Sequence, residues 1–256
     1  MNLITKNDLF LLEEIVKKNF LFKYKGSVLG VIWTILSPLL MMILFTIIFS
    51  TIFAKNIENY AVYYLCGWCL FQFFRSSITS SMNSITGNSS ILKRTPAPKY
   101  IFVLGGILSE VLNYLIMLIL LVVIMFVTHA PFYFPLLLGS IIPFISIFIM
   151  VTGLGLMLSV ATVYYVDIKY LWSVISMMLM YASSIFYPME IVPQPFRGYL
   201  MLSPLYWAID HFRSFVYYGI APNVAGLINS LLLSLIILIC GIIVFKKYED
   251  KVVTQF

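Results

Sequence analysis

The sequence predicts an all-α integral membrane protein with six transmembrane helices, an N-terminal amphipathic interfacial helix, and re-entrant half-helices on the outer side before the last span. Three observations predict this class. Of the 256 residues, 62% are hydrophobic and 10% are charged, whereas soluble domains are about half apolar and about a quarter charged. Charge-free runs of membrane-spanning length recur along the chain, and the basic residues gather in alternate connections. A single transmembrane domain therefore occupies residues 1–256.

The first element is an amphipathic stretch over residues 8–25. On a helical wheel, charged side chains such as Glu13 and Lys17 lie on one arc, and apolar side chains such as Leu12 and Ile15 lie on the other. Such a helix, with basic and aromatic residues, typically lies in the membrane interface. A cytosolic helix packed on a partner is the alternative, and the two interpretations are compatible.

Six apolar runs follow, separated by charged residues, prolines and polar loops. A span needs about 20 apolar residues, each rising 1.5 Å, to cross about 30 Å of hydrocarbon. We therefore predict transmembrane helices at 28–54, 60–86, 101–128, 136–163, 170–187 and 223–245.

Segment 188–222, before the last span, is rich in aromatic residues and interrupted by prolines. It is too broken for a span and too apolar for a solvated loop. Irregular backbone at membrane depth must be satisfied by protein or by a water-filled cavity. We predict a pair of re-entrant half-helices in the outer leaflet.

The distribution of basic residues predicts the orientation. With six spans, both termini and the second and fourth connections share one side, which carries twelve of the sixteen Lys and Arg residues. The other side carries three, and Arg75 lies within a span. By the positive-inside rule both termini are cytoplasmic. The net charge of +6 thus reflects membrane topology rather than nucleic-acid binding.

Motifs for catalysis or cofactor binding are absent from the sequence. No Gly-rich phosphate loop occurs, and no His, Cys or Asp cluster has the spacing of metal ligands. Cys66 and Cys69 form a C-x-x-C, but inside an apolar helix, where cysteine behaves as a small buried hydrophobe. We therefore predict no catalytic residue, no metal and no enzymatic activity in this chain.

Two charged residues lie deep within predicted spans. Arg75 and Glu110 are each about ten residues from the inner end of their helix, which at 1.5 Å per residue is about 15 Å deep. An unpaired charge at this depth is costly, so we expect the two to form an intramembrane ion pair. The pair is either structural or a polar point on a substrate path.

Several local patterns recur in a fixed order along the chain: Lys23–Trp33 with Ser37-Pro38-Leu39, then Leu65–Phe74, Ser109–Asn113 and Tyr164–Lys169, and finally Phe186-Tyr187-Pro188 with Leu202–Leu205. Together they resemble one family, the permease subunits of bacterial type-2 ABC exporters for surface polysaccharide, O-antigen and teichoic acid. The resemblance covers essentially the whole chain, although Val166, Lys23 and Ser203 depart from the family pattern.

The resemblance implies a homodimer bound to two copies of a separate ABC ATPase, which would hold ATP and magnesium, so that this chain needs no cofactor. The protein would lie in a bacterial or archaeal cytoplasmic membrane and export a lipid-linked glycan. The ATPase-coupling loops would contain Leu92, Lys93, Arg94, Asp167 and Lys169. The channel, lined by the first and fifth spans, would include Trp33, Ser37, Tyr181, Phe186 and Tyr187.

Two other hypotheses stay open at this point. One is an ABC permease for drugs or simple lipids, which shares the six-span plan. The other is a membrane enzyme acting on a polyprenyl-linked sugar, which would need acidic residues at the membrane surface to hold a metal. Asp167 stands almost alone among the internal cytoplasmic segments, which disfavours the enzyme. The glycan and its lipid carrier are not specified by the sequence.

Overall fold

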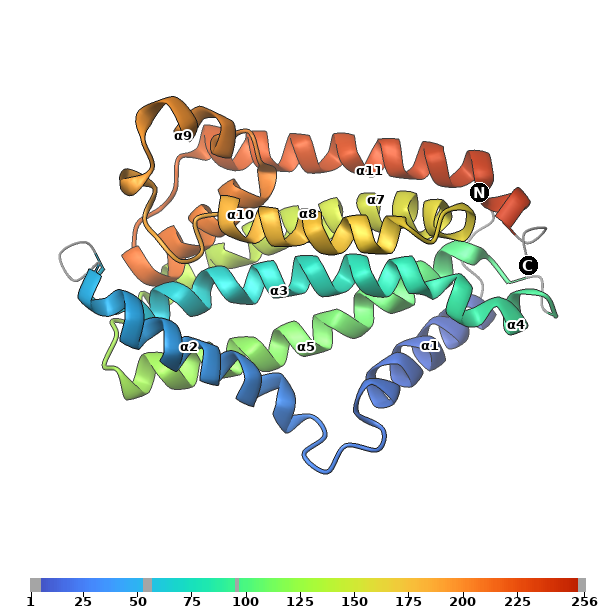
Figure 1. Cartoon of the computed structure of the whole chain (residues 1–256), viewed down its shortest axis with the longest axis horizontal. Helices are drawn as coiled ribbons and strands as arrows, with labels where there is room; N and C mark the ends of the chain where they lie inside the picture. The colour runs from blue at the N-terminus through green and yellow to red at the C-terminus, as the bar shows by residue number, and fades with distance from the viewer. Residues whose placement is uncertain (1–5, 53–56, 95–96, 253–256) are drawn as a thin grey trace.

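The structure, a computed structural model, describes residues 6–52, 57–94 and 97–252, and within them it consists of helices and connecting turns with no strand (Figure 1). The all-helical class is confirmed. The elements are α1 (Lys6–Tyr24), α2 (Ile32–Ile52), α3 (Tyr60–Ser84), η1 (Thr86–Asn88), α4 (Ser89–Leu92), α5 (Lys99–Val127), α6 (Phe134–Leu137), η2 (Leu138–Ser140), α7 (Ile141–Tyr164), α8 (Ile168–Ala182), η3 (Met189–Ile191), α9 (Gln194–Met201), α10 (Pro204–Arg213), η4 (Ser214–Tyr218) and α11 (Val224–Val252).

Four segments of the described chain are long and apolar enough to cross a bilayer: Ile32–Ser50, Lys99–Val127, Phe134–Tyr164 and Val224–Glu249. The other two predicted spans differ from these. Helix α3 has 25 residues but carries polar side chains along one face. Helix α8 has only 15 residues, about 22 Å, and ends at Ala182 where we predicted 187. The count of six spans therefore stays a prediction.

Helix α3 lies at the centre of the bundle, packed against α5 and α7 along its length and against α2, α8 and α10 on its other sides (Figure 1). Aromatic side chains fill these contacts. The Phe73 ring lies 5.6 Å from that of Tyr114 in α5 and 5.2 Å from that of Phe144 in α7. Because aromatic rings bury large areas, these contacts fix which face of α3 meets α5 and α7.

Helices α7 and α11 pack closely through small residues. A Cβ added to Gly153 would lie 2.5 Å from the Ile237 carbonyl oxygen, and one added to Gly241 would lie 2.3 Å from that of Gly153. The hydroxyls of Ser146 and Ser234 also hydrogen-bond across this contact at 3.0 Å. Small residues that allow backbones to approach are the usual basis of helix association in lipid.

Helix α1 packs on the first half of α5, with the buried Ile15 side chain against Gly105. Its opposite face is exposed, and there Lys17 pairs with Glu13 at 2.7 Å, a hydrogen bond that raises the pKa of Lys17. The amphipathic pattern thus produces a helix with one packed face. Its predicted placement in the membrane interface remains a prediction.

The turn between α1 and α2 depends on two glycines. Gly26 has φ +83° and Gly30 has φ +50°, both in the left-handed region that glycine adopts at little cost. The Ser27 hydroxyl accepts a hydrogen bond from the Gly30 amide at 3.1 Å and holds the turn. These residues belong to the first family-like motif, and their backbone conformation explains why glycine occupies both positions.

The segment before α11 consists of η3, α9, α10 and η4 rather than one long helix, and its predicted re-entrant placement in the outer leaflet stays a prediction (Figure 1). Its anchor is Arg213, which is buried at 3% exposure. The guanidinium donates to the backbone carbonyls of Ser184 (2.7 Å), Ile185 (2.9 Å) and Tyr63 (3.3 Å) and stacks 3.7 Å from the Tyr63 ring centroid. A Cβ on Gly67 would lie 2.6 Å from this guanidinium. One buried cation thus joins α10, α3 and the end of α8.

Candidate functional site

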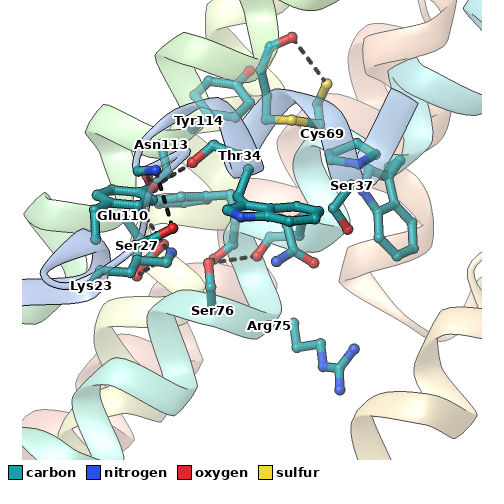
Figure 2. A pocket seen from close by; sticks show the side chains of 18 residues that line it. Lys23, Ser27, Thr34, Ser37, Cys69, Arg75, Ser76, Glu110, Asn113 and Tyr114 are labelled. Atoms are coloured by element: carbon teal, nitrogen blue, oxygen red, sulfur yellow. Dashed lines mark hydrogen bonds and ion pairs between the residues drawn. The ribbon is translucent and has the colours of Figure 1, made fainter. Parts of the chain in front are cut away.

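A polar cavity of about 460 Å³ lies inside the otherwise apolar bundle, between the end of α1, the first half of α2, and the middles of α3 and α5 (Figure 2). Three kinds of side chain line it: charged groups, small hydroxyls and amides, and aromatic rings. Among them are Lys23, Trp33, Ser37, Gln72, Arg75 and Glu110. A cavity of this size and mixed lining can hold water and several polar groups of a ligand.

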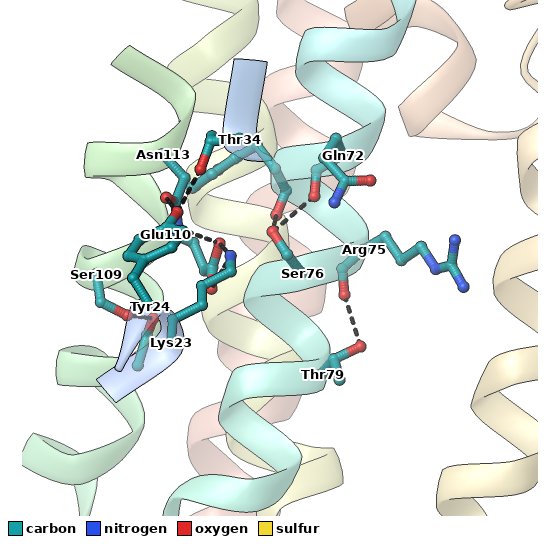
Figure 3. Close-up of polar contacts among 12 residues, drawn as sticks. Lys23, Tyr24, Thr34, Gln72, Arg75, Ser76, Thr79, Ser109, Glu110 and Asn113 are labelled. Carbon is teal, nitrogen blue, oxygen red and sulfur yellow. Dashed lines mark hydrogen bonds and ion pairs between the residues drawn. The ribbon is translucent and has the colours of Figure 1, made fainter. Parts of the chain in front are cut away.

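One wall of the cavity is a chain of hydrogen bonds that ends on the Glu110 carboxylate (Figure 3). Lys23 Nζ contacts both carboxylate oxygens, at 3.1 and 3.2 Å, and Asn113 Nδ2 donates to one of them at 2.8 Å. The Tyr24 hydroxyl donates to Asn113 Oδ1 at 2.5 Å, so it accepts its other hydrogen bond from Thr34. Every donor in this series of hydrogen bonds points toward Glu110, and the series joins α1, α2 and α5.

The structure corrects the predicted partner of Glu110, which is Lys23 rather than Arg75. The Arg75 side chain is exposed and extends away from Glu110 in Figure 3. The reason is helical geometry, since residues two positions apart point about 200° apart. Phe73 packs on Tyr114 of α5, so Arg75 faces the other side of α3.

Arg75 belongs to a row of polar residues on α3, which we call the α3 polar stripe: Gln72, Arg75, Ser76, Thr79 and Asn83. Their spacing of three and four residues places them along one side of the helix. The stripe runs from the cavity toward the α4 end. Trp172 of α8 donates from Nε1 to the Thr79 hydroxyl at 3.2 Å, which places α8 beside the stripe.

The five predicted channel residues form two separate groups. Trp33 and Ser37 both line the polar cavity and are exposed. Tyr181 lies in the last turn of α8, and Phe186 and Tyr187 follow the helix end, where the Tyr187 hydroxyl donates to the Tyr181 carbonyl at 2.5 Å. The Phe186 ring is 5% exposed and packs between other aromatic rings, so it contributes to the core of the protomer. The channel role of these residues stays a prediction.

The predicted coupling residues lie in two places at the same end of the molecule: α4 with the turn after it, and the turn between α7 and α8 with the first turn of α8 (Figure 1). Arg94 and Asp167 are exposed, whereas Leu92 is buried and Lys169 is partly covered. Lys93 is also exposed. Their contact with an ATPase stays a prediction.

Helix α1 reaches the first of these connections. Lys18 Nζ donates to Asn88 Oδ1 at 2.9 Å, and Asn88 Nδ2 donates back to the Ser84 carbonyl at 2.7 Å. The connection at η1 is therefore tied both to α3 and to the amphipathic helix. The sequence gives no sign of this contact, because Lys18 and Asn88 are 70 residues apart.

No group of three or more His, Cys, Asp or Glu side chains gathers closely enough to hold a metal ion within the described ranges. The polar cavity contains one acidic side chain, Glu110, and that carboxylate already contacts an ammonium and an amide. The arrangement is suited to contacting a polar ligand.

The chain matches the ABC-2 type transporter family over residues 11–217, and it belongs to that family. Among its relatives, an O-antigen export system permease protein RfbA from Klebsiella pneumoniae is 28% identical over 243 residues, covering 94% of this chain and 93% of the relative. The RfbA protein of Myxococcus xanthus is 20% identical over 244 residues, with 94% and 93% covered. The capsule polysaccharide export inner-membrane protein CtrC of Neisseria meningitidis is 20% identical over 248 residues, with 94% and 92% covered.

Proposed function

We propose that this protein is the permease subunit of an ATP-driven ABC exporter that moves a lipid-linked polysaccharide, of the O-antigen, capsule or teichoic acid kind, out across the cytoplasmic membrane. The observation that carries the proposal is the match to O-antigen and capsule export permeases over 94% of the chain. The polar cavity inside an apolar bundle is consistent with it, because a carrier of polar cargo needs a polar surface at membrane depth.

In this proposal α2, α3, α5, α7, α8 and α11 cross the membrane, and the α4 end of the bundle faces the cytoplasm. Basic residues support this orientation, because Lys93, Arg94 and Lys169 lie in the two connections at that end. Lys246 and Lys247 lie in the last turns of α11, which also ends there (Figure 1). By the positive-inside rule this end is cytoplasmic.

The substrate path of the proposal follows the polar cavity and the α3 polar stripe. Sugars present hydroxyls at their edges and C–H groups on their faces, so hydroxyls, amides and aromatic rings suit them. Trp33 and Trp68 supply rings in the cavity, and Ser37, Gln72 and Ser76 supply polar groups. The exposed faces of α2 and α8 flank the stripe, and a second copy of the chain would cover them and complete a channel as a homodimer.

Energy for transport would come from two copies of a separate ATPase that hold ATP and magnesium, with no cofactor in this chain. Arg94 and Asp167 are exposed at the cytoplasmic end and are positioned to contact such a partner. Lys18 of α1 hydrogen-bonds Asn88 in the first connection. Through α1, a movement of that connection would be transmitted to the polar cavity.

A permease for drugs or simple lipids is the second candidate. The relatives favour the glycan exporter, because those named here are permeases for O-antigen or capsule polysaccharide. The two candidates differ in what accumulates when the permease is lost: a lipid-linked glycan inside the membrane, or no glycan at all.

The test is purification of the tagged protein, expressed with its neighbouring genes, in mild detergent. We expect a P-loop ATPase at equal stoichiometry, lost in an Arg94→Ala, Asp167→Ala double variant and kept in an Arg197→Ala control at the opposite end. Deletion of the gene should leave lipid-linked glycan on the cytoplasmic side, measured by lectin or antibody access in spheroplasts. A protein that purifies without an ATPase, in cells that still export their glycan, would refute the proposal.

A further inference from the structure

We infer that Arg75 of the α3 polar stripe, with the Gln72 amide beside it, is an anion-binding site that contacts the phosphate joining the exported glycan to its lipid carrier. This inference rests on the proposed function and assigns one residue pair to one chemical group of the cargo. Four observations lead to it: the depth of the charge, the absence of a protein counter-ion, the neighbouring amide, and the geometry of the guanidinium.

The depth of Arg75 in the bundle gives its charge a high free-energy cost. It lies nine residues before the end of α3, which at 1.5 Å per residue is about 14 Å from that end of a helix about 37 Å long. A cationic side chain near the bilayer centre costs at least several kcal/mol unless it meets water or an anion. The side chain is exposed in the protomer, so nothing in the bundle shields it from that environment.

Within the described ranges of the chain, no protein group compensates this charge. In the part of the chain that the structure describes, Lys17 pairs with Glu13 and Glu14, and Lys23 pairs with Glu110, so none of these carboxylates pairs with Arg75. The Arg75 guanidinium has no hydrogen-bond partner in the described chain, and it points away from Glu110 (Figure 3). Because Lys23 already neutralises Glu110, the three charges that line the cavity leave a net charge of about +1 at the Arg75 side.

The Gln72 side chain lies one turn from Arg75 on the same stripe, and its amide also has no partner among the described residues (Figure 3). Both residues line the polar cavity, as does Trp68, whose indole N–H makes no hydrogen bond. The guanidinium and the indole N–H are donors only, whereas the Gln72 amide offers an N–H donor and a carbonyl acceptor. The Trp68 nitrogen is covered by protein, so a ligand that supplies oxygen acceptors and negative charge would be bound by the guanidinium and the amide N–H.

Guanidinium geometry favours a phosphate. Its planar fork donates two parallel hydrogen bonds to phosphate oxygens, which an ammonium cannot do. A path for a long polymer should not hold every sugar tightly, and one fixed cation meets that need. A lipid-linked glycan carries the linking phosphate once per molecule, so a single cation on the stripe would act once, when the lipid end enters the path.

The test measures binding of geranylgeranyl diphosphate to the purified permease–ATPase complex in nanodiscs of uncharged phosphatidylcholine, by the shift of thermal stability with ligand concentration. We expect Arg75→Gln to weaken binding about tenfold or more, as for loss of a hydrogen bond to a charged group. Arg75→Lys, which keeps the charge without the fork, should be intermediate. Lys6→Gln, a charge loss at the start of α1, is the matched control and should bind as the wild type does, which also accounts for diphosphate bound by the ATPase.

Three further ligands identify the bound group: geranylgeraniol, inorganic pyrophosphate and a glucuronic acid oligosaccharide. Arg75-dependent binding of the lipid diphosphate, with much weaker binding of all three, supports the inference. Equal Arg75-dependent binding of pyrophosphate or of the uronic acid would overturn the lipid-phosphate assignment. Unchanged binding in Arg75→Gln, or dissociation of the permease dimer in that variant, would also overturn it. If wild-type cells export the glycan while Arg75 proves irrelevant to binding, this inference fails and the proposed function stands.

Discussion

Replacement of Lys23 by Met tests the hydrogen-bonded wall of the polar cavity. The Glu110 side chain is 9% exposed, and it receives Lys23 at 3.1 and 3.2 Å and Asn113 at 2.8 Å. Loss of Lys23 leaves a buried carboxylate with Asn113 alone. A hydrogen bond to a charged group contributes about 1.5–3 kcal/mol, and removing one partner of a fully buried pair costs about 3–5 kcal/mol. Because Lys23 is 42% exposed, we expect a loss nearer 2 kcal/mol.

Glu110→Gln should cost less, about 1 kcal/mol, because the new amide oxygen still accepts from Asn113 and the half-exposed Lys23 can reach water. The double variant should be more stable than the sum of the two losses predicts, by about 1 kcal/mol. The measurement is the fraction of purified protein that stays monodisperse after heating, where 1 kcal/mol corresponds to about 2–4 °C in the midpoint for a chain of this size.

Lys17→Met is the control for this cycle, because its pair with Glu13 is exposed and should be dispensable. Strictly additive losses in the double variant would refute the pairing of Lys23 with Glu110. A Glu110→Gln variant less stable than Lys23→Met would refute the assignment of the carboxylate as the buried member of the pair.

Three other replacements test contacts elsewhere in the bundle. Arg213→Met should lower stability by about 3 kcal/mol, since three backbone carbonyls lose their donor; a variant as heat-resistant as the wild type would contradict the anchoring role. Gly153→Ala should abolish or strongly reduce the yield of folded protein, because the added Cβ would meet backbone at 2.5 Å, whereas Gly198→Ala, with nothing within 4 Å, should express normally. Lys18→Met should leave stability nearly unchanged but reduce transport-coupled ATP hydrolysis, because it removes the hydrogen bond to Asn88. Unchanged ATP hydrolysis in this variant would contradict a role of the contact between α1 and the first connection.

Much of the helical plan could be predicted from the sequence, because charge-free apolar runs mark the helices in a membrane protein. Helix α5 lies at 99–127 against a prediction of 101–128, and α3 at 60–84 against 60–86. The partner of Glu110 could not be predicted in the same way. Lys23 is 87 residues distant in sequence, and its approach depends on how α1 packs along α5. Helical periodicity places Arg75 opposite Phe73, but only packing decides which of them faces α5.

The early end of α8 shows a second limit of sequence reasoning. Ile185, Phe186 and Tyr187 follow the two serines after Ala182, and they favoured a span to 187. In the structure Ser184 has φ +55°, and the carbonyls of Ser184 and Ile185 turn toward the Arg213 guanidinium instead of continuing the helix. The sequence shows no signal for this, because Arg213 is nearly thirty residues away and reads as a charge on the outer side.

The two contacts of α1 have a mechanical consequence. Lys18 holds the connection at Asn88, and Lys23, five residues or about 7.5 Å further along, holds Glu110 at the wall of the polar cavity. A rigid rod attached at both points transmits displacement without storing it. A push on the connection at Asn88 would therefore tilt α1 and shift the cavity wall directly, while the close α7–α11 pair remained stationary as the fixed frame.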